Sequence, residues 1–188
     1  MMDIKVVGRG GQGAVSAVYM LALSAFKEGY YTQASAVFGI ERQGSEVNSY
    51  CRISKKPIYR YDEVKEPSVL ILLDPTLLES SPEKVLSRNG LLLINTNKKN
   101  TDFEFRRDII VKTINASSIS LKIFNRPLFN TPMLGAFAGV TGLISISSLY
   151  KAISETFKAK GRVIIDLNKE AASIAYKEKI KDKVIVEL

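Results

Sequence analysis

Four glycines within six residues stand near the start of the chain, between a β-branched stretch and a segment rich in small residues. The stretch from Ile4 to Val7 is predicted to be a buried strand, and a helix is predicted from about Gln12 to Lys27. A strand that enters a helix through glycines leaves main-chain N–H groups free at the helix start, where about half an elementary positive charge suits a phosphate or carboxylate. The pattern therefore predicts either an anion site or a turn in which glycine only allows the helix to pack closely on the sheet.

We name residues 8–13 the glycine turn, and they supply most of the candidate binding residues. Those predicted to contact a cofactor are Gly8, Gly10, Gly11, Gln12 and Gly13. Three of these glycines match the G-x-G-x-x-G spacing of dinucleotide-binding folds, in which glycine lets the phosphates approach the main chain. In such folds an acidic residue at the end of the second strand holds the ribose, whereas Gln33 and Ser35 occupy that region here. This difference argues against a nicotinamide cofactor.

Glu41 and Arg42 form the second candidate site, in a polar loop bracketed by glycines. Arginine can bind two oxygens of a phosphate or carboxylate at once, although an exposed Glu–Arg pair with no ligand is the simpler interpretation. A second strand is predicted from Tyr30 to Ala34, parallel to the first and beside it, because a right-handed helical crossover joins the two. Both strands would end at the same edge of the sheet, so we expect this loop to lie near the glycine turn.

Composition restricts the chemistry that the chain can perform alone. It has 188 residues, a formal net charge of +8, no histidine and one cysteine, Cys51. Without histidine, the commonest general base and the Ser-His-Asp and Cys-His triads are excluded. A single cysteine supplies neither an internal disulfide nor an iron–sulfur site. No apolar run reaches the length of a membrane span, and Met1-Met2-Asp3 does not begin a signal peptide, so we expect a cytoplasmic protein with no membrane partner.

Strands and helices are predicted to alternate along the chain. Val69–Leu73 is a continuous apolar run typical of a parallel strand covered on both faces, and a short helix from Pro82 to Arg88 follows it. A short edge strand is predicted over Ile58–Tyr61. The order indicates one α/β domain over residues 1–188, a three-layer α/β/α Rossmann-like fold with a mainly parallel sheet.

Four helices are predicted in the second half of the chain. One is capped by Asn115, and two amphipathic helices span Ile146–Phe157 and Leu167–Ile180. Asn130 is expected to cap the fourth, whose small, apolar residues Met133–Val140 indicate burial. We also expect this segment to leave an apolar surface exposed in the isolated chain, which would then self-associate.

The chain resembles the gamma subunit, or fused gamma domain, of the 2-oxoacid:ferredoxin oxidoreductases, most closely the pyruvate and 2-ketoisovalerate members. The resemblance runs from Lys5 to about Lys177. It rests on four motifs in order, which are Gly8-Arg9-Gly10-Gly11-Gln12-Gly13, Phe38-Gly39-Ile40-Glu41-Arg42-Gln43-Gly44, Leu72-Leu73-Asp74 and Asn130-Thr131-Pro132-Met133-Leu134-Gly135-Ala136. The chain departs from the family at Gln43, where a second arginine is typical.

The resemblance implies a non-redox part of a larger enzyme that converts a 2-oxoacid to an acyl-coenzyme A and passes electrons to ferredoxin. It implies alpha, beta and delta-type partner subunits, which hold thiamine pyrophosphate, Mg²⁺ and the [4Fe-4S] clusters. This chain would bind none of these cofactors alone, and we expect the isolated chain to show no oxidoreductase activity. The glycine turn, Glu41 and Arg42 would close the active centre, with coenzyme A as co-substrate.

Two other functions remain open from the sequence. A stand-alone dinucleotide-binding enzyme would use the glycine turn, although no plausible base accompanies it. A nucleic-acid-binding module would use the basic residues, but these are scattered and lack regular aromatic interleaving, so no nucleic-acid partner is expected.

Overall fold

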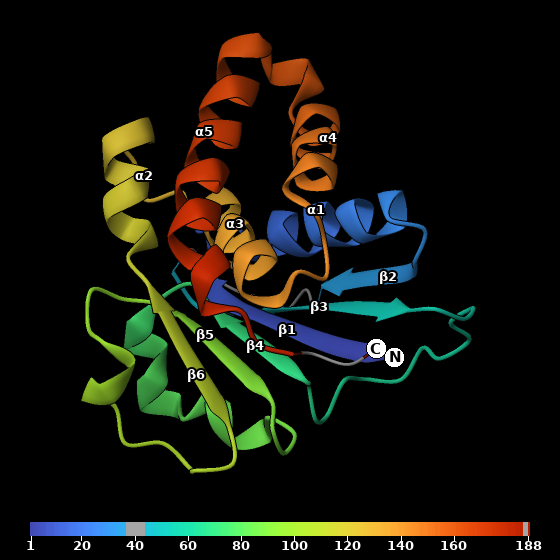
Figure 1. The fold of residues 1–188 in the computed structure, drawn as a ribbon, viewed down its shortest axis with the longest axis vertical. Helices are drawn as coiled ribbons and strands as arrows, with labels where there is room; N and C mark the ends of the chain where they lie inside the picture. Colours follow the sequence, from blue (N-terminus) through green and yellow to red (C-terminus); the bar gives the residue numbers. More distant parts are fainter. Residues whose placement is uncertain (37–43, 186–187) are drawn as a thin grey trace.

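The computed structural model describes residues 1–36, 44–185 and 188, which form a single sheet with its α-helices on one face (Figure 1). The strands are β1 (Met2–Arg9), β2 (Tyr31–Ala36), β3 (Glu46–Ser54), β4 (Val69–Leu72), β5 (Leu91–Asn95) and β6 (Ile110–Ile114). The α-helices are α1 (Ala14–Lys27), α2 (Ala116–Phe124), α3 (Asn130–Thr141), α4 (Ile146–Thr156) and α5 (Arg162–Lys179). This arrangement confirms the predicted α/β fold.

The strand order is β2-β3-β1-β4-β5-β6. Strands β1, β4, β5 and β6 run parallel to one another, whereas β3 runs antiparallel to both of its neighbours, β1 and β2. The prediction of a mainly parallel sheet is confirmed, and β1 and β2 do run in the same direction. The prediction that they are neighbours is wrong, because β3 returns between them and pairs with both strands.

Strand β4 is entirely apolar, and β5 is apolar up to its last residue, because both faces of these two strands are covered. All four residues of β4 and all five of β5 are buried, as the continuous run from Val69 to Leu73 predicted. Parallel strands that lack a solvent face have no reason to alternate between apolar and polar residues. The sheet is therefore the centre of two separate apolar cores.

The larger core lies between the sheet and the α-helices. Helix α3 is at its centre and packs against α5 so closely that a Cβ atom on Gly135 would overlap the main chain of Ala172. The predicted segment Met133–Val140 is buried within the chain, as its small residues indicated. The expectation that this segment leaves an exposed apolar surface is wrong, since α4 and α5 of the same chain cover it.

The smaller core covers the opposite face of the parallel strands. Its buried side chains come from β1, β4 and β5, from the 3₁₀ helix η1 (Pro75–Ser80), and from Leu86, which directly follows a second 3₁₀ helix, η2 (Pro82–Val85). Helix η2 replaces the α-helix predicted from Pro82 to Arg88. It ends early because Leu86 adopts an extended conformation, with φ −61° and ψ 139°, and is buried against the sheet.

One predicted strand and one predicted cap are wrong. Residues 58–61 are irregular, because the main-chain carbonyl of Arg60 accepts a hydrogen bond from the side chain of Arg52 rather than from a strand. Asn130 is the first residue of α3 and not its cap, since its side chain reaches across to α1. The predicted cap at Asn115 is confirmed by its bond to the N–H of Ser118.

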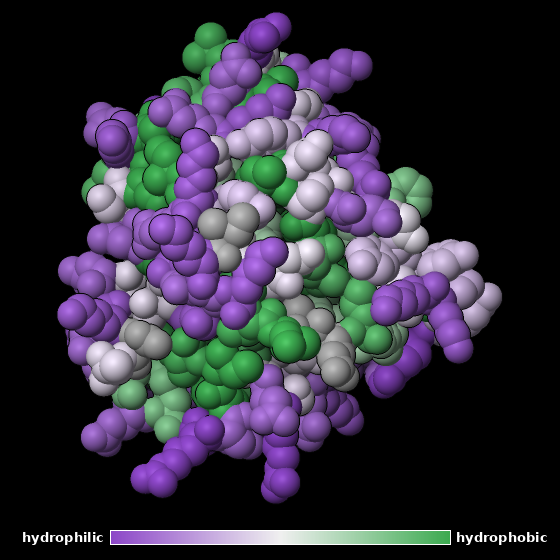
Figure 2. Space-filling model, viewed as in Figure 1, coloured by the Kyte–Doolittle hydropathy of each residue, from purple (hydrophilic) through white to green (hydrophobic). Residues whose placement is uncertain are grey.

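Other boundaries differ by a few residues. Helix α5 begins five residues before the predicted Leu167, and α4 ends within one residue of its prediction. Figure 2 shows hydrophilic side chains spread around the outline of the visible face, with hydrophobic patches between them. Among the residues that the structure describes, no helix is both long and apolar enough to cross a lipid bilayer.

Candidate functional site

The glycine turn joins the carboxyl end of β1 to the start of α1. Gly8 and Arg9 still belong to the strand, so the turn itself begins later than its first glycine. Gly11 and Gly13 adopt φ +95° and +89°, in the left-handed region that favours glycine. Gly13 stands directly before α1, and no side chain caps that helix start.

The sequence left two roles open for the glycines of the turn, close packing of the helix on the sheet and the approach of an anion. Different glycines suit the two roles. A Cβ atom on Gly8 would lie 3.0 Å from Leu73, and one on Gly13 would lie 3.0 Å from the amide nitrogen of Asn130. These two glycines allow close packing. A Cβ atom on Gly11 would have no neighbour within 4 Å among the described residues, which leave open space above that glycine.

Gln12 fixes the turn by bonding to two strands. Its side-chain oxygen accepts a hydrogen bond from the N–H of Arg9 at 2.8 Å, and its amide nitrogen donates to Asp74 at 2.7 Å. Strand β4 ends at Leu72, and Asp74 is the second residue after that end. The side chain of Gln12 therefore holds the end of β1 against the end of β4.

Arg9 and Asp74 complete this network together with Thr76. Arg9 Nη2 donates to Thr76 Oγ1 at 2.7 Å, and Arg9 Nε lies 3.4 Å from Asp74 Oδ2. Burial by itself would raise the pKa of Asp74, but hydrogen bonds from Thr76 and Gln12 and the charge of Arg9 outweigh burial and lower it. The carboxylate is therefore ionised at neutral pH and keeps the Arg9 side chain beside the turn.

A second network holds the turn from the helical side. Asn130 donates to Ser16 Oγ at 2.9 Å, and Ser16 Oγ donates to the carbonyl of Gly13 at 2.9 Å. On the same side, buried Thr131 donates to Asn168 of α5 at 3.0 Å. Helices α1, α3 and α5 thus share one path of polar contacts that ends at the glycine turn.

A hollow of about 420 Å³ opens between the turn and the first residues of α1. Its walls come from the turn, from α1 and from β3, and they are Arg9, Gly11, Gly13, Ala14, Val15, Ser16, Tyr19 and Val47. The side chain of Arg9 keeps 39% of its surface exposed there. A helix start, a cation and open space over a glycine together can bind a phosphate or carboxylate.

Glu41 and Arg42 lie outside the described residues, so their predicted place beside the turn stays a prediction. The two residues that follow this loop segment, Gly44 and Ser45, do contact the turn. The N–H of Gly10 donates to the carbonyl of Ser45 at 2.9 Å, and Arg9 Nη1 donates to the carbonyl of Gly44 at 3.2 Å. The chain therefore leaves the loop directly beside the glycine turn.

Several residues of this site were absent from the predicted set, among them Arg9, Ser16, Asp74, Thr76 and Asn130. Arg9 and Asp74 stood within motifs that carry the family resemblance, which was the available signal. Nothing in the sequence pairs Ser16 with Asn130, because 114 positions separate them.

The arrangement of β2 does not favour a dinucleotide enzyme. In such folds the acidic residue that binds the ribose lies on the strand beside β1. Here β3 occupies that place, and Gln33 on β2 accepts a hydrogen bond from Arg52 at 3.2 Å. Strand β2, which would end in that acidic residue, is therefore separated from the strand that leads into the glycine turn.

The family model and the similar known proteins indicate the same family. Residues 3–178 match the family model described as pyruvate ferredoxin/flavodoxin oxidoreductase. The chain is 43% identical to pyruvate synthase subunit PorC of Methanocaldococcus jannaschii, with 96% of this chain and 98% of that protein covered. It is 38% identical to the pyruvate/ketoisovalerate oxidoreductases common subunit gamma of Thermococcus kodakarensis, with the same two shares covered.

A solved structure shows the same fold. The crystal structure of pyruvate oxidoreductase subunit PORC from Thermotoga maritima superimposes with a TM-score of 0.79 at 35% sequence identity. The match covers 94% of this chain and 95% of that one, so both chains share the fold over nearly their whole length.

Proposed function

The chain belongs to the pyruvate ferredoxin/flavodoxin oxidoreductase family as a gamma-type subunit, and from this premise we propose that its glycine turn binds the phosphate groups of coenzyme A. As a gamma subunit it is part of a multi-subunit oxidoreductase complex that acts on pyruvate or another 2-oxoacid with ferredoxin. The observation that carries the proposal is the hollow beside Arg9 and the start of α1.

The site combines three features that suit a phosphate. The N-terminus of α1 presents main-chain N–H groups, the open space above Gly11 allows a ligand to approach the main chain, and Arg9 supplies a positive charge. Asp74 and Gln12 hold Arg9 and the turn in place before any ligand arrives. Such preorganisation reduces the entropy lost on binding.

We assign the redox and decarboxylation chemistry to alpha, beta and delta-type partner subunits. In this proposal they hold thiamine pyrophosphate, Mg²⁺ and [4Fe-4S] clusters, which supply decarboxylation and electron transfer to ferredoxin. The cysteine content of this chain does not fit an iron–sulfur cluster. Cys51, its one cysteine, is fully buried, and burial raises the pKa of its thiol, so it offers no thiolate ligand.

Coenzyme A binding can be tested by placing a side chain in the open space over the turn. In the complex assembled from this chain and its partner subunits, Gly11→Asn is expected to raise the KM for coenzyme A about tenfold and to leave the KM for the 2-oxoacid unchanged. A tenfold change corresponds to about 1.4 kcal/mol of lost binding. Asparagine is chosen because it tolerates positive φ better than most residues.

Gly29→Asn is the matched control, since Gly29 has φ +89° and equally open surroundings but lies beyond the end of α1. It should leave both constants as they are in the wild-type complex. Equal KM values for coenzyme A in both variants would refute the proposed site.

The loop that holds Glu41 and Arg42 is included as a separate proposal. The contacts of Gly44 and Ser45 with the turn support it. Arg42→Ala is expected to lower turnover or coenzyme A affinity while the fold stays intact. Kinetics identical to those of the wild-type complex would remove Arg42 from the site and leave the assignment of the turn untouched.

A further inference from the structure

In the sheet formed by the described residues, strand β2 is an edge strand and pairs with β3 alone. The pairing is continuous over six residue pairs, from Tyr31 with Ser54 to Ala36 with Ser49, and it contains no bulge. Within the described part of the chain, no main-chain hydrogen bond other than those to β3 involves β2. Its outer side therefore presents a row of N–H and C=O groups that another strand can bind.

This edge lacks the features that usually prevent such pairing. Exposed edge strands commonly carry lysine, proline or a bulge, or they are very short. Residues 31–36 read Tyr-Thr-Gln-Ala-Ser-Ala, with no charge and no proline. Its small side chains at positions 34–36 also leave the main chain accessible.

A hollow of about 340 Å³ lies beside this edge, on the face of the sheet away from the α-helices. Strands β2 and β3 and residues 61–64 line it, with both apolar and charged side chains, namely Gln33, Ser35, Tyr50, Arg52, Tyr61, Asp62, Glu63 and Val64. A strand added beside β2 would direct alternate side chains toward this face. Main-chain pairing combined with a pocket for alternate side chains is a recurrent way to bind an extended segment.

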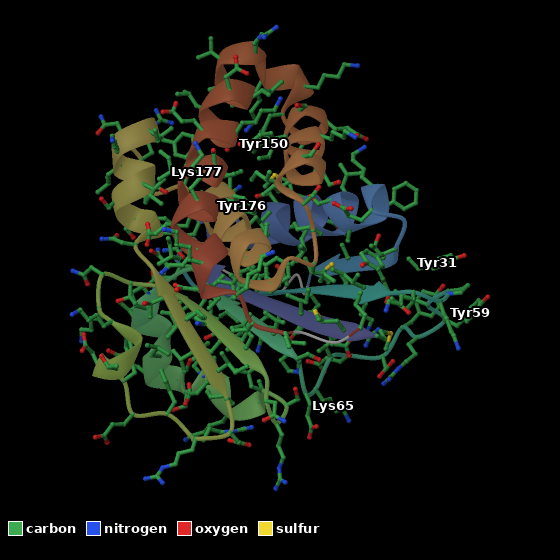
Figure 3. All side chains as sticks on the ribbon, in the orientation of Figure 1. Tyr31, Tyr59, Lys65, Tyr150, Tyr176 and Lys177 are labelled. Carbon is green, nitrogen blue, oxygen red and sulfur yellow. The ribbon has the colours of Figure 1, made fainter. Side chains whose placement is uncertain are left out.

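Exposed tyrosines surround the same region. Tyr31, Tyr59 and Tyr61 are 50%, 82% and 88% exposed. Tyr31 and Tyr59 project from the same end of the molecule, where β2 starts and β3 ends (Figure 3). Tyrosine is enriched at protein–protein interfaces, so these side chains mark a contact surface.

We propose that the outer edge of β2 pairs with an extended segment of another subunit of the oxidoreductase complex, which places an apolar side chain in the hollow beside Tyr50 and Tyr61. The inference rests on membership of the multi-subunit complex and is independent of the ligand bound by the glycine turn. A net charge of +8 and the exposed Lys55 and Lys56 beyond β3 favour a partner with acidic residues over a second copy of this chain.

The test places a charge on the edge strand. Ser35→Lys changes an exposed residue of β2, and Ser147→Lys makes the same change at an exposed position of α4. Each tagged variant is co-expressed with the other subunits of the complex, which are then quantified by mass spectrometry after capture. Ser35→Lys should reduce the captured subunits at least tenfold, whereas Ser147→Lys should retain them at the wild-type level.

Hydrogen exchange provides a readout that does not depend on a variant. The amides of residues 31–36 that point away from β3 should become protected when the wild-type chain is in the complex. Equal capture by both lysine variants, with these amides unprotected, would overturn the proposed interface alone. A wild-type chain that captured no subunit would overturn it together with the proposed function. Dimers of the isolated chain that Ser35→Lys dissociates, with capture unchanged, would assign the edge to a second copy instead.

Discussion

The two halves of the sheet are covered in different ways on the face away from the α-helices. Behind β4 and β5 lies an apolar core, where Leu70, Leu72 and Leu92 pack against residues from η1 and η2. Behind β2 and β3 that face is a mixture of polar and aromatic side chains, and buried Arg52 donates hydrogen bonds to the carbonyls of Arg60 and Asp62, which holds their segment against the sheet. Apolar side chains cover the half that contains β4 and β5. Ion pairs and hydrogen bonds to main-chain carbonyls hold the cover of the half that contains β2 and β3.

This contrast explains why one half is suited to stability and the other to contacts. The free energy gained by burying apolar side chains is roughly proportional to the buried area and does not depend on a particular partner. Short 3₁₀ helices can therefore cover the parallel strands in place of α-helices. The antiparallel half ends in an uncharged edge with a hollow beside it. We therefore expect substitutions in the two halves to have effects of different size.

The largest effect is expected in the apolar half. Leu72→Ala removes a fully buried side chain of β4 and leaves a cavity, which should lower the free energy of unfolding by about 2–5 kcal/mol. Ser35→Ala on the matching face of β2 should change it by less than about 0.5 kcal/mol. Urea denaturation of the isolated chain measures both values. Similar losses from the two substitutions would show that the halves do not differ as described.

The next effect concerns Arg52, whose side chain is 5% exposed and lies 3.2 Å from Asp3. Arg52→Ala leaves that carboxylate and the carbonyls of Arg60 and Asp62 without their donor, so we expect a loss of about 3 kcal/mol. Hydrogen exchange should show that residues 58–64 become less protected while β4 and β5 do not.

Arg60→Ala is the control for this substitution, because the Arg60 side chain is 60% exposed. It should leave the stability close to that of the wild-type chain. If Arg52→Ala were as mild as Arg60→Ala, the polar half would be held by something other than this buried arginine.

The smallest effect is a pH dependence at Asp62. A hydrogen bond from Arg60 is the main cause that lowers the pKa of this carboxyl to about 2 in the folded chain. Since the ordinary value is about 3.9, the stabilisation is fully present above about pH 4 and is lost as the pH falls through about 2. An NMR titration of the Asp62 carboxyl carbon should show this midpoint, and Arg60→Ala should move it upward. An unchanged midpoint in that variant would exclude the pair as its cause.

Several features of the fold could be predicted because they depend on neighbours in the chain. The apolar run from Val69 to Leu73, the glycines before α1 and the cap at Asn115 each act over a few residues, and the structure contains all three. The helix predicted from Pro82 failed because the burial of Leu86 against the sheet decided its conformation. The strand predicted at 58–61 does not form, because the side chain of Arg52 donates hydrogen bonds to the main-chain carbonyls of Arg60 and Asp62.

The candidate site divides in the same manner. The sequence alone determined that a strand, a glycine turn and a helix follow one another, since glycine, β-branched and small residues constrain the local main chain. Only the tertiary structure decided that β3 lies between β1 and β2, that Asp74 holds Gln12, and that Asn130 reaches Ser16. These contacts join residues that are far apart in the chain, and their formation depends on the order of strands in the sheet and the packing of α3 against α1.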